Sequence, residues 1–261
     1  MIRAGIGGWN FDPWRGVFYP KGTPKTKELH YASRALTTIE VNGTFYSTFK
    51  PPTFQKWYSE TPEDFVFSLK ANQFCTNRKV LAEAKPSLDR FLESGIVELK
   101  QKLGPILWQF AHTKKFDPAD FEAFLALLPK TLGGLTLRHA IEPRHESFKT
   151  PAFVALARKY NAGIVFADAK KYPSIPDATS DFVYCRLQES QENAPTGYKP
   201  AELKKWAEAA KAWEAGGVPK GMKTVGKVAP KKKRDVFVYF ISGAKVRNPA
   251  AAMGFLKALK K

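Results

Sequence analysis

The chain has 261 residues, 44% of them hydrophobic, and a formal net charge of +18 at pH 7. That length and apolar content support a full hydrophobic core and argue against extended disorder. No apolar stretch approaches the roughly 20 residues that a membrane-spanning helix needs, so we predict no membrane partner.

The start of the chain and its cysteines indicate a compartment. Residues 1–9 lack the apolar core of a secretory signal and enter a predicted strand at once. Cys75 and Cys185 form neither a disulfide framework nor a metal-ligand spacing, which is typical of separate reduced thiols. We therefore predict a cytoplasmic protein.

The excess of basic residues bears on partners and not on the fold. A field of this sign attracts polyanions such as nucleic acid, and also phosphorylated small molecules, through long-range steering. The same charge can serve solubility alone, so both interpretations stay open.

Eight short apolar runs recur along the whole chain, and nearly all of them end in charged or polar residues. The runs span residues 2–7, 38–42, 65–70, 106–110, 137–144, 163–168, 182–187 and 236–240. Segments of helical length lie between most of them, at 25–36, 51–58, 87–101, 118–128, 150–160, 200–215 and 249–259. This alternation predicts an α/β fold with one domain over residues 1–261, a single (β/α)8 TIM-like barrel whose active site lies at the carboxyl ends of the strands.

Two intervals depart from the pattern. Residues 169–181 are too short and too rich in proline for a crossover helix, so we predict an irregular barrel between strands six and seven. Residues 219–234 hold seven basic residues and no acidic one, with glycines and prolines that favour a basic flexible loop. This segment enters strand eight from a helix and therefore lies on the face opposite the active site. Its end, 231–234, resembles a nuclear-localisation or nucleic-acid patch, although a solvated loop would look the same.

Alternation of side chains along each strand predicts which residues face the barrel axis. Polar residues of the inward phase, or at the strand ends, should gather at the mouth of the barrel. We predict four catalytic residues there: Glu40, Lys70, Glu142 and Asp168. We predict seven substrate-binding residues: Trp9, Asn42, Gln109, Arg144, His145, Arg186 and Tyr239. Of these, His145 has the outward phase unless Pro143 bends the strand.

These residue types suit proton transfer next to a bound anion. Carboxylates with displaced pKa values act as general acids or bases, and Arg144 and Arg186 suit bidentate recognition of a carboxylate or phosphate. Lys70 could stabilise a developing anion or form a Schiff base. One such residue alone would be typical of a structural ion pair, whereas six charges at the strand ends of one face favour a function.

The sequence predicts no metal site and no cofactor. Four histidines are spread over the chain, and a multinuclear zinc site needs more imidazoles at one place. A single Mg²⁺ or Mn²⁺ held by Glu40, Glu142 and Asp168 stays open. Residues 5–8 are too short and badly placed for a dinucleotide or P-loop motif.

The chain resembles the YecE-like family, a family of TIM-barrel proteins with a domain of unknown function. The matching segments are Gly7-Gly8-Trp9, residues 14–20, Ile39-Glu40-Val41-Asn42-Gly43-Thr44-Phe45-Tyr46, Phe67-Ser68-Leu69-Lys70, residues 103–109, residues 141–148 and residues 181–187. The resemblance implies the barrel over almost the whole chain and implies no activity. The chain departs from the family in Gln188-Glu189, where His-Gly is common, in Phe240-Ile241-Ser242, where Phe-Asn-Asn is common, and in the basic segment 219–234.

Three functions follow as hypotheses. The first is an enzyme that uses the mouth cluster on an anionic or hydroxylated small molecule, in hydrolysis, elimination or isomerisation. The alternative is a nucleic-acid-binding or nucleic-acid-processing protein, which the net charge favours. The third is a non-catalytic binding module. The sequence indicates no oligomeric state.

Overall fold

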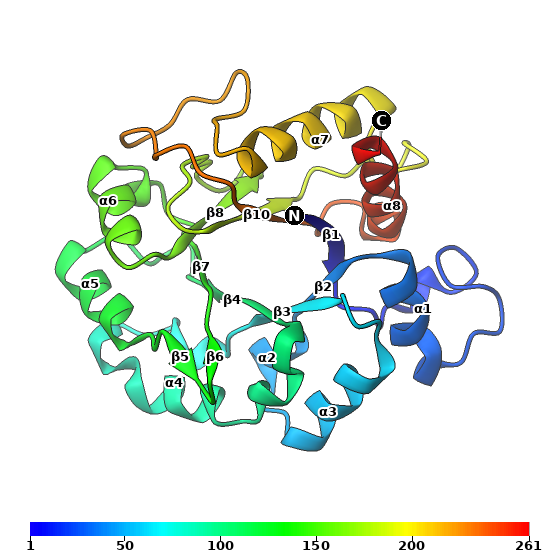
Figure 1. Cartoon of the computed structure of the whole chain (residues 1–261), viewed down its shortest axis with the longest axis horizontal. Helices are drawn as coiled ribbons and strands as arrows, with labels where there is room; N and C mark the ends of the chain where they lie inside the picture. The colour runs from blue at the N-terminus through cyan, green and yellow to red at the C-terminus, as the bar shows by residue number, and fades with distance from the viewer. Residues whose placement is uncertain (261) are drawn as a thin grey trace.

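The computed structural model describes residues 1–260 and contains a closed barrel of eight parallel strands (Figure 1). The strands are β1 (Ile2–Gly7), β2 (Thr38–Val41), β3 (Val66–Lys70), β4 (Leu103–Gln109), β7 (His139–Glu142), β8 (Gly163–Asp168), β9 (Phe182–Leu187) and β10 (Asp235–Phe240). The barrel closes where β1 pairs in parallel with both β10 and β2. The predicted (β/α)8 fold is confirmed.

Helices surround the strands, so that each strand buries its outward face (Figure 1). The α-helices are α1 (Glu28–Ala35), α2 (Gly43–Tyr46), α3 (Pro51–Glu60), α4 (Lys85–Leu92), α5 (Pro118–Leu127), α6 (Pro151–Lys159), α7 (Pro200–Glu214) and α8 (Asn248–Leu259). Short 3-10 helices span Asp12–Trp14, Lys25–Lys27, Gln73–Cys75, Leu81–Ala84, Ile96–Lys102, Glu146–Phe148 and Lys245–Arg247. Within residues 1–260, no helix is long and apolar enough to cross a membrane.

Two cores result from the alternation of side chains along the strands. The larger lies between the barrel and the helices. The smaller fills the barrel interior and consists of Val66, Leu107, Ala140, Val165, Phe182, Tyr184, Phe237, Tyr239 and Ile241. Polar residues of the same phase lie above this inner core, toward the carboxyl ends of the strands, and they form the site described below.

The structure differs from the prediction in two segments. The predicted helix 87–101 is divided, because Gly95 adopts φ 107° between α4 and the 3-10 helix Ile96–Lys102. A two-stranded hairpin, β5 (Thr131–Leu132) and β6 (Leu135–Thr136), follows α5 and was not predicted. Its turn is Gly133-Gly134, and both glycines have positive φ.

The interval between β8 and β9 contains no helix, which confirms the irregularity predicted there. The basic segment 219–234 likewise has no helix or strand and runs from α7 to β10 on the face opposite the mouth. Hydrogen bonds anchor it to the rest of the protein. The carboxylate of Asp177 accepts from the backbone N–H groups of Val225 and Gly226, and the buried Arg234 donates to the Ser180 carbonyl. The flexibility of the segment stays a prediction.

Candidate active site

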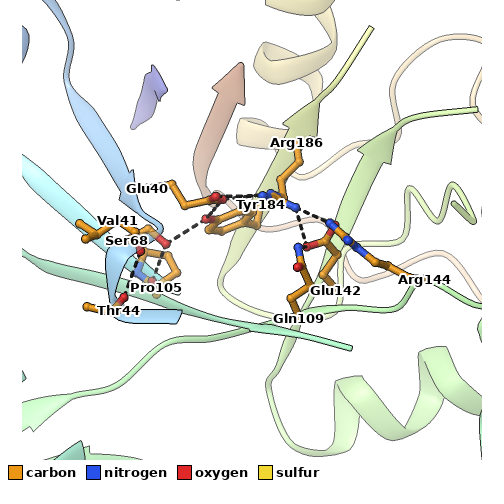
Figure 2. A network of polar contacts seen from close by, with 10 residues as sticks. All are labelled: Glu40, Val41, Thr44, Ser68, Pro105, Gln109, Glu142, Arg144, Tyr184 and Arg186. Atoms are coloured by element: carbon orange, nitrogen blue, oxygen red, sulfur yellow. Dashed lines mark hydrogen bonds and ion pairs between the residues drawn. The ribbon is translucent and has the colours of Figure 1, made fainter. Parts of the chain in front are cut away.

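Arg186, on β9, lies at the centre of a buried charge network at the barrel mouth (Figure 2). Its Nε and Nη2 donate to Glu40 of β2 at 3.0 and 2.9 Å, and its Nη1 donates to the two oxygens of Glu142 of β7 at 2.8 and 2.7 Å. Both glutamates are fully buried. One guanidinium thus bridges two carboxylates that come from opposite sides of the barrel.

Two further predicted residues donate hydrogen bonds to Glu142. Gln109 of β4 donates its amide to Glu142 at 2.6 Å, and Arg144 donates through Nε and Nη2 at 3.3 Å (Figure 2). The Arg144 guanidinium lies 4.4 Å from the ring centroid of Tyr172, in the irregular loop between β8 and β9. Arg144 is partly exposed, so this cation is the member of the network that solvent reaches most readily.

Hydroxyl groups form hydrogen bonds beneath the network, between it and the inner core. Tyr184 Oη donates to Glu40 at 2.7 Å and lies 2.9 Å from Ser68 Oγ, which donates to the Pro105 carbonyl (Figure 2). The ring of Tyr239 packs against that of Tyr184, with centroids 4.8 Å apart. Tyr239 Oη lies 2.8 Å from Thr38 Oγ1, and the residue belongs to the inner core. Tyr239 therefore lies beneath the mouth and does not reach the space where a substrate could bind.

The network sets the charge of its members. Burial alone would raise the pKa of Glu142, but Arg186, Arg144 and the Gln109 amide outweigh burial and hold that pKa at about 2. Burial alone would lower the pKa of Arg186, but the two carboxylates raise it above its usual range. Glu142 and Arg186 are therefore both charged at neutral pH.

Lys70, the last residue of β3, lies beside this network and differs from its other members. Its side chain is 6% exposed, and its ammonium makes no hydrogen bond or ion pair with any residue in the described part of the chain. Nζ lies 3.7 Å from the ring centroid of Phe45. Burial and the positive charge of Arg186 lower the Lys70 pKa to about 8, although Glu40 and Glu142 act in the opposite direction.

A short helix after β2 holds Phe45 over this ammonium. The Thr44 hydroxyl, in α2, donates to the Val41 carbonyl at 3.0 Å (Figure 2). It also donates to the Lys70 carbonyl at 2.7 Å. These bonds tie α2 to the ends of β2 and β3. The aromatic ring over Lys70 is therefore fixed by the backbone of the two strands that it covers.

Asp168 does not join the network, so its predicted place at the mouth was wrong. The residues of its phase, Ile164 and Phe166, face the helices, and Phe166 packs against Trp206 and Trp213 of α7. Asp168 lines a separate cavity, where burial and the neighbouring Glu189 raise its pKa. The inward positions of β8 are occupied by Val165 and Ala167 instead.

Trp9 was predicted at the mouth and lies outside the barrel wall. Gly8 adopts φ 72° and turns the chain after β1. The Trp9 ring packs edge-on against Trp57 of α3, with centroids 5.1 Å apart, and against the outward-facing Phe67. Trp9 and Asn42 both line a cavity beside the mouth.

His145 keeps the outward phase and takes a local role. Its Nδ1 accepts from the backbone N–H of Ser147 at 3.1 Å and lies 2.9 Å from the Ser147 hydroxyl. These contacts cap the 3-10 helix Glu146–Phe148. His145 is not part of the network around Arg186.

The three oxygen ligands considered for Mg²⁺ or Mn²⁺ are not brought together, because Asp168 lies away from Glu40 and Glu142. The two glutamates instead bind Arg186. Across residues 1–260, no group of three or more histidines, cysteines, aspartates or glutamates is arranged to hold a metal ion.

Three residues of the site were missed from the sequence. Tyr184 shares the inward phase of Arg186, so the phase of the strand could have identified it. Phe45 belongs to a four-residue helix that lies outside the helical segments predicted from the sequence. Tyr172 lies in a loop without regular structure, where no periodicity gives its direction.

Known proteins resemble the chain over its full length in structure. A DUF72 family protein from Thermotoga maritima MSB8 matches with a TM-score of 0.76 and 23% identity, covering 100% of both chains. Another from Enterococcus faecalis V583 has a TM-score of 0.71 and 20% identity, covering 100% of this chain and 98% of the other. At these identities the likeness establishes the fold alone.

Sequence comparison gives the family. The UPF0759 protein YunF of Bacillus subtilis (strain 168) is 28% identical in an alignment 165 residues long, which covers 59% of this chain and 54% of YunF. The match thus spans about half the length of that curated relative. The family model described as "Protein of unknown function DUF72" matches residues 3–261, and it confirms the resemblance drawn from the motifs. The chain belongs to the DUF72 family.

Proposed function

We propose that the protein is an acid/base enzyme that acts on an anionic or hydroxylated small molecule, with Lys70 as the group that accepts and returns the proton. The observation that carries the proposal is a buried strand-end lysine with a pKa of about 8 and no carboxylate partner. A base is most effective when its pKa lies near the working pH, and burial is the usual means of lowering that of a lysine.

Glu40 and Glu142 have a different part in this proposal. A carboxylate with a pKa of about 2 that already accepts from Gln109, Arg144 and Arg186 is a poor base at neutral pH. Glu40 accepts hydrogen bonds from Arg186 and from the Tyr184 hydroxyl, so we assign both glutamates to positioning Arg186. The positive charge of Arg186, in turn, helps to keep Lys70 deprotonated in part of the molecules.

The chemistry that suits this arrangement begins with a carbon acid. The neutral Lys70 amine takes a proton from carbon next to a carbonyl group, and the C–H electron pair moves toward the carbonyl oxygen. If the deprotonated carbon carries a hydroxyl group, return of the proton to the former carbonyl carbon and transfer of the hydroxyl proton to the former carbonyl oxygen complete an isomerisation. If the next carbon, on the side away from the carbonyl, carries a leaving group, its departure with the bonding pair forms the C=C double bond and completes an elimination. In a hydrolysis the same amine would take its proton from water. Arg144, the partly exposed cation of the network, would bind the anionic group of the substrate.

Solvent-exchange measurements test the proposal without knowledge of the product. The enzyme is incubated in D₂O with a panel of hydroxy acids, sugars and their phosphates, and deuterium at carbon is followed by NMR. Exchange into at least one compound is expected, and Lys70→Met should slow it by about 10²–10⁴-fold, the usual contribution of a general base. The control Lys149→Met removes an exposed lysine after β7 and should leave the rate unchanged. Equal rates for wild type and Lys70→Met would remove Lys70 from the reaction.

A second function, binding of nucleic acid, is favoured by the charge of the segment 219–234. Its five exposed lysines without an ion pair in residues 1–260 are Lys220, Lys223, Lys227, Lys231 and Lys233. Lys232 instead pairs with Asp181. If this segment contacts phosphates, affinity for DNA or RNA should fall steeply with salt, and the slope should shrink when Lys231 and Lys233 are replaced by serine. Absence of binding at about 50 mM salt would contradict this function.

A further inference from the structure

A cavity of about 760 Å³ opens beside the barrel mouth, at the carboxyl ends of β1 and β2 and next to α1 and α3. These four elements lie together on the right-hand side of Figure 1. The volume falls within the range of about 300–1,000 Å³ that small-molecule sites occupy. The network around Arg186 does not line the cavity, which therefore has a chemistry of its own.

One part of the cavity wall is aromatic. Trp57 is buried and packs edge-on against both Trp9 and Phe49, at centroid distances of 5.1 and 5.3 Å. Trp9 and Phe49 are only half-buried and line the cavity. Because Trp57 fixes both rings, they offer a rigid apolar surface to a flat group in the cavity.

Asn42 supplies the polar edge of the same space. It follows β2, two residues beyond Glu40, and its side-chain amide makes no hydrogen bond to the part of the protein that the structure describes. The amide lies over Gly7, where a Cβ atom would come within 2.8 Å of its nitrogen. The absence of a side chain at Gly7 thus leaves room for an amide that can donate and accept at once.

Three lysines line this cavity, with a single acidic residue among them. The three come from different parts of the chain and are Lys25, Lys56 and Lys245. The acidic residue is Glu60, whose Oε1 lies 3.8 Å from Lys56 Nζ. Lys25 and Lys245 form no ion pair with the described residues. Burial lowers the pKa of Lys245, whose Nζ lies 4.1 Å from the ring centroid of Phe11. Lysines acting as point charges at an apolar cavity complement a phosphate group.

We propose that this cavity binds a phosphate monoester carried by a ring, with one face of the ring against Trp9, its polar edge on Asn42, and the phosphate among Lys25, Lys56 and Lys245. A nucleotide and a sugar phosphate share this chemistry. The proposal goes beyond the proposed function, because Arg144, assigned there to the anionic group of the substrate, does not line this cavity. Binding in the cavity does not depend on turnover.

Calorimetric titration of the full chain tests the proposal with adenosine 5′-monophosphate and glucose 6-phosphate, each beside its dephosphorylated form and inorganic phosphate. We expect one phosphorylated ring to bind at least about tenfold more tightly than its dephosphorylated form and than phosphate alone, a difference of about 1.4 kcal/mol. The outcome also separates the two sources. Binding of neither phosphorylated ring would overturn the proposal.

Variants locate the site. The triple variant Lys25→Ser/Lys56→Ser/Lys245→Ser and the single variant Asn42→Ala should each weaken binding about tenfold or more. The matched control replaces Lys204, Lys211 and Lys257 by serine, because these lysines line a cavity of about 730 Å³ between α7 and α8. An equal loss in this control would overturn the assignment to the Trp9 cavity.

Lys70→Met separates this proposal from the enzymatic one. The variant should bind the phosphorylated ring as wild type does, whether or not deuterium exchange occurs. Exchange that does not depend on Lys70, with binding intact, contradicts the proposed function alone. Exchange that depends on Lys70, without binding in the Trp9 cavity, contradicts the cavity assignment alone.

Discussion

Removal of Arg186 should destabilise the protein far more than removal of an exposed cation. In Arg186→Met, Glu40 and Glu142 lose donors at 2.7–3.0 Å and remain buried without their shared counter-charge. Breaking a buried ion pair from one side costs about 3–5 kcal/mol, because the remaining charge stays desolvated. We therefore expect the free energy of unfolding, measured with urea at pH 7, to fall by about that amount.

Two controls sharpen this measurement. Lys85→Met removes the exposed partner of Asp89, which should cost no more than about 1 kcal/mol. The triple variant Glu40→Gln/Glu142→Gln/Arg186→Met removes the charges together and should be more stable than Arg186→Met alone. A loss below about 1 kcal/mol in Arg186→Met, or a triple variant less stable than the single one, would refute the reasoning about the buried network.

Three other outcomes follow from the same contacts. Lys70→Met should raise the free energy of unfolding at pH 7, because lowering a lysine pKa from 10.5 to about 8 corresponds to about 3 kcal/mol. This gain should disappear as pH rises from 8 toward 10.5, where the lysine of the unfolded chain also becomes neutral. Urea unfolding of both proteins across that pH range measures the difference. Because the pKa of Glu142 in the folded protein is depressed, its contribution to stability should be present above about pH 4.5 and be lost as pH falls toward 2. In acid unfolding, the stability of Glu142→Gln should therefore fall less over this pH range than that of the wild type. Gly5→Ala should lower the thermal midpoint, since its Cβ would lie 1.8 Å from the Thr38 carbonyl oxygen; an unchanged midpoint would mean that β1 and β2 can separate.

Alternation along the strands was enough to identify most of the buried network from the sequence. Glu40, Lys70, Gln109, Glu142 and Arg186 all lie at the inward or top positions that their strand phases indicate. The alternation predicts these inward positions because each of these strands has apolar residues on its outward face.

Alternation along the strands does not predict the position of a residue where the phase or the backbone direction changes. Asp168 shares the phase of residues packed on α7, and the charge at its strand end was mistaken for an inward position. Gly8 turns Trp9 away from the mouth through a positive φ that the preceding strand does not reveal. Gly95 ends a predicted helix, and a Cβ there would lie 2.7 Å from Pro51. Each error depends on a tertiary contact or a single backbone dihedral.

Titration of the Lys70 side chain tests whether this lysine can act as the base. The chain can be labelled with lysine carrying ¹³C at Cε, and the Lys70 resonance is assigned by its loss in Lys70→Met. Its chemical shift is then followed from about pH 6 to about pH 11, which spans the expected midpoint and that of an ordinary lysine. A midpoint of about 8 is expected. A midpoint of about 10.4, that of an ordinary lysine, would contradict the assignment of Lys70 as the base.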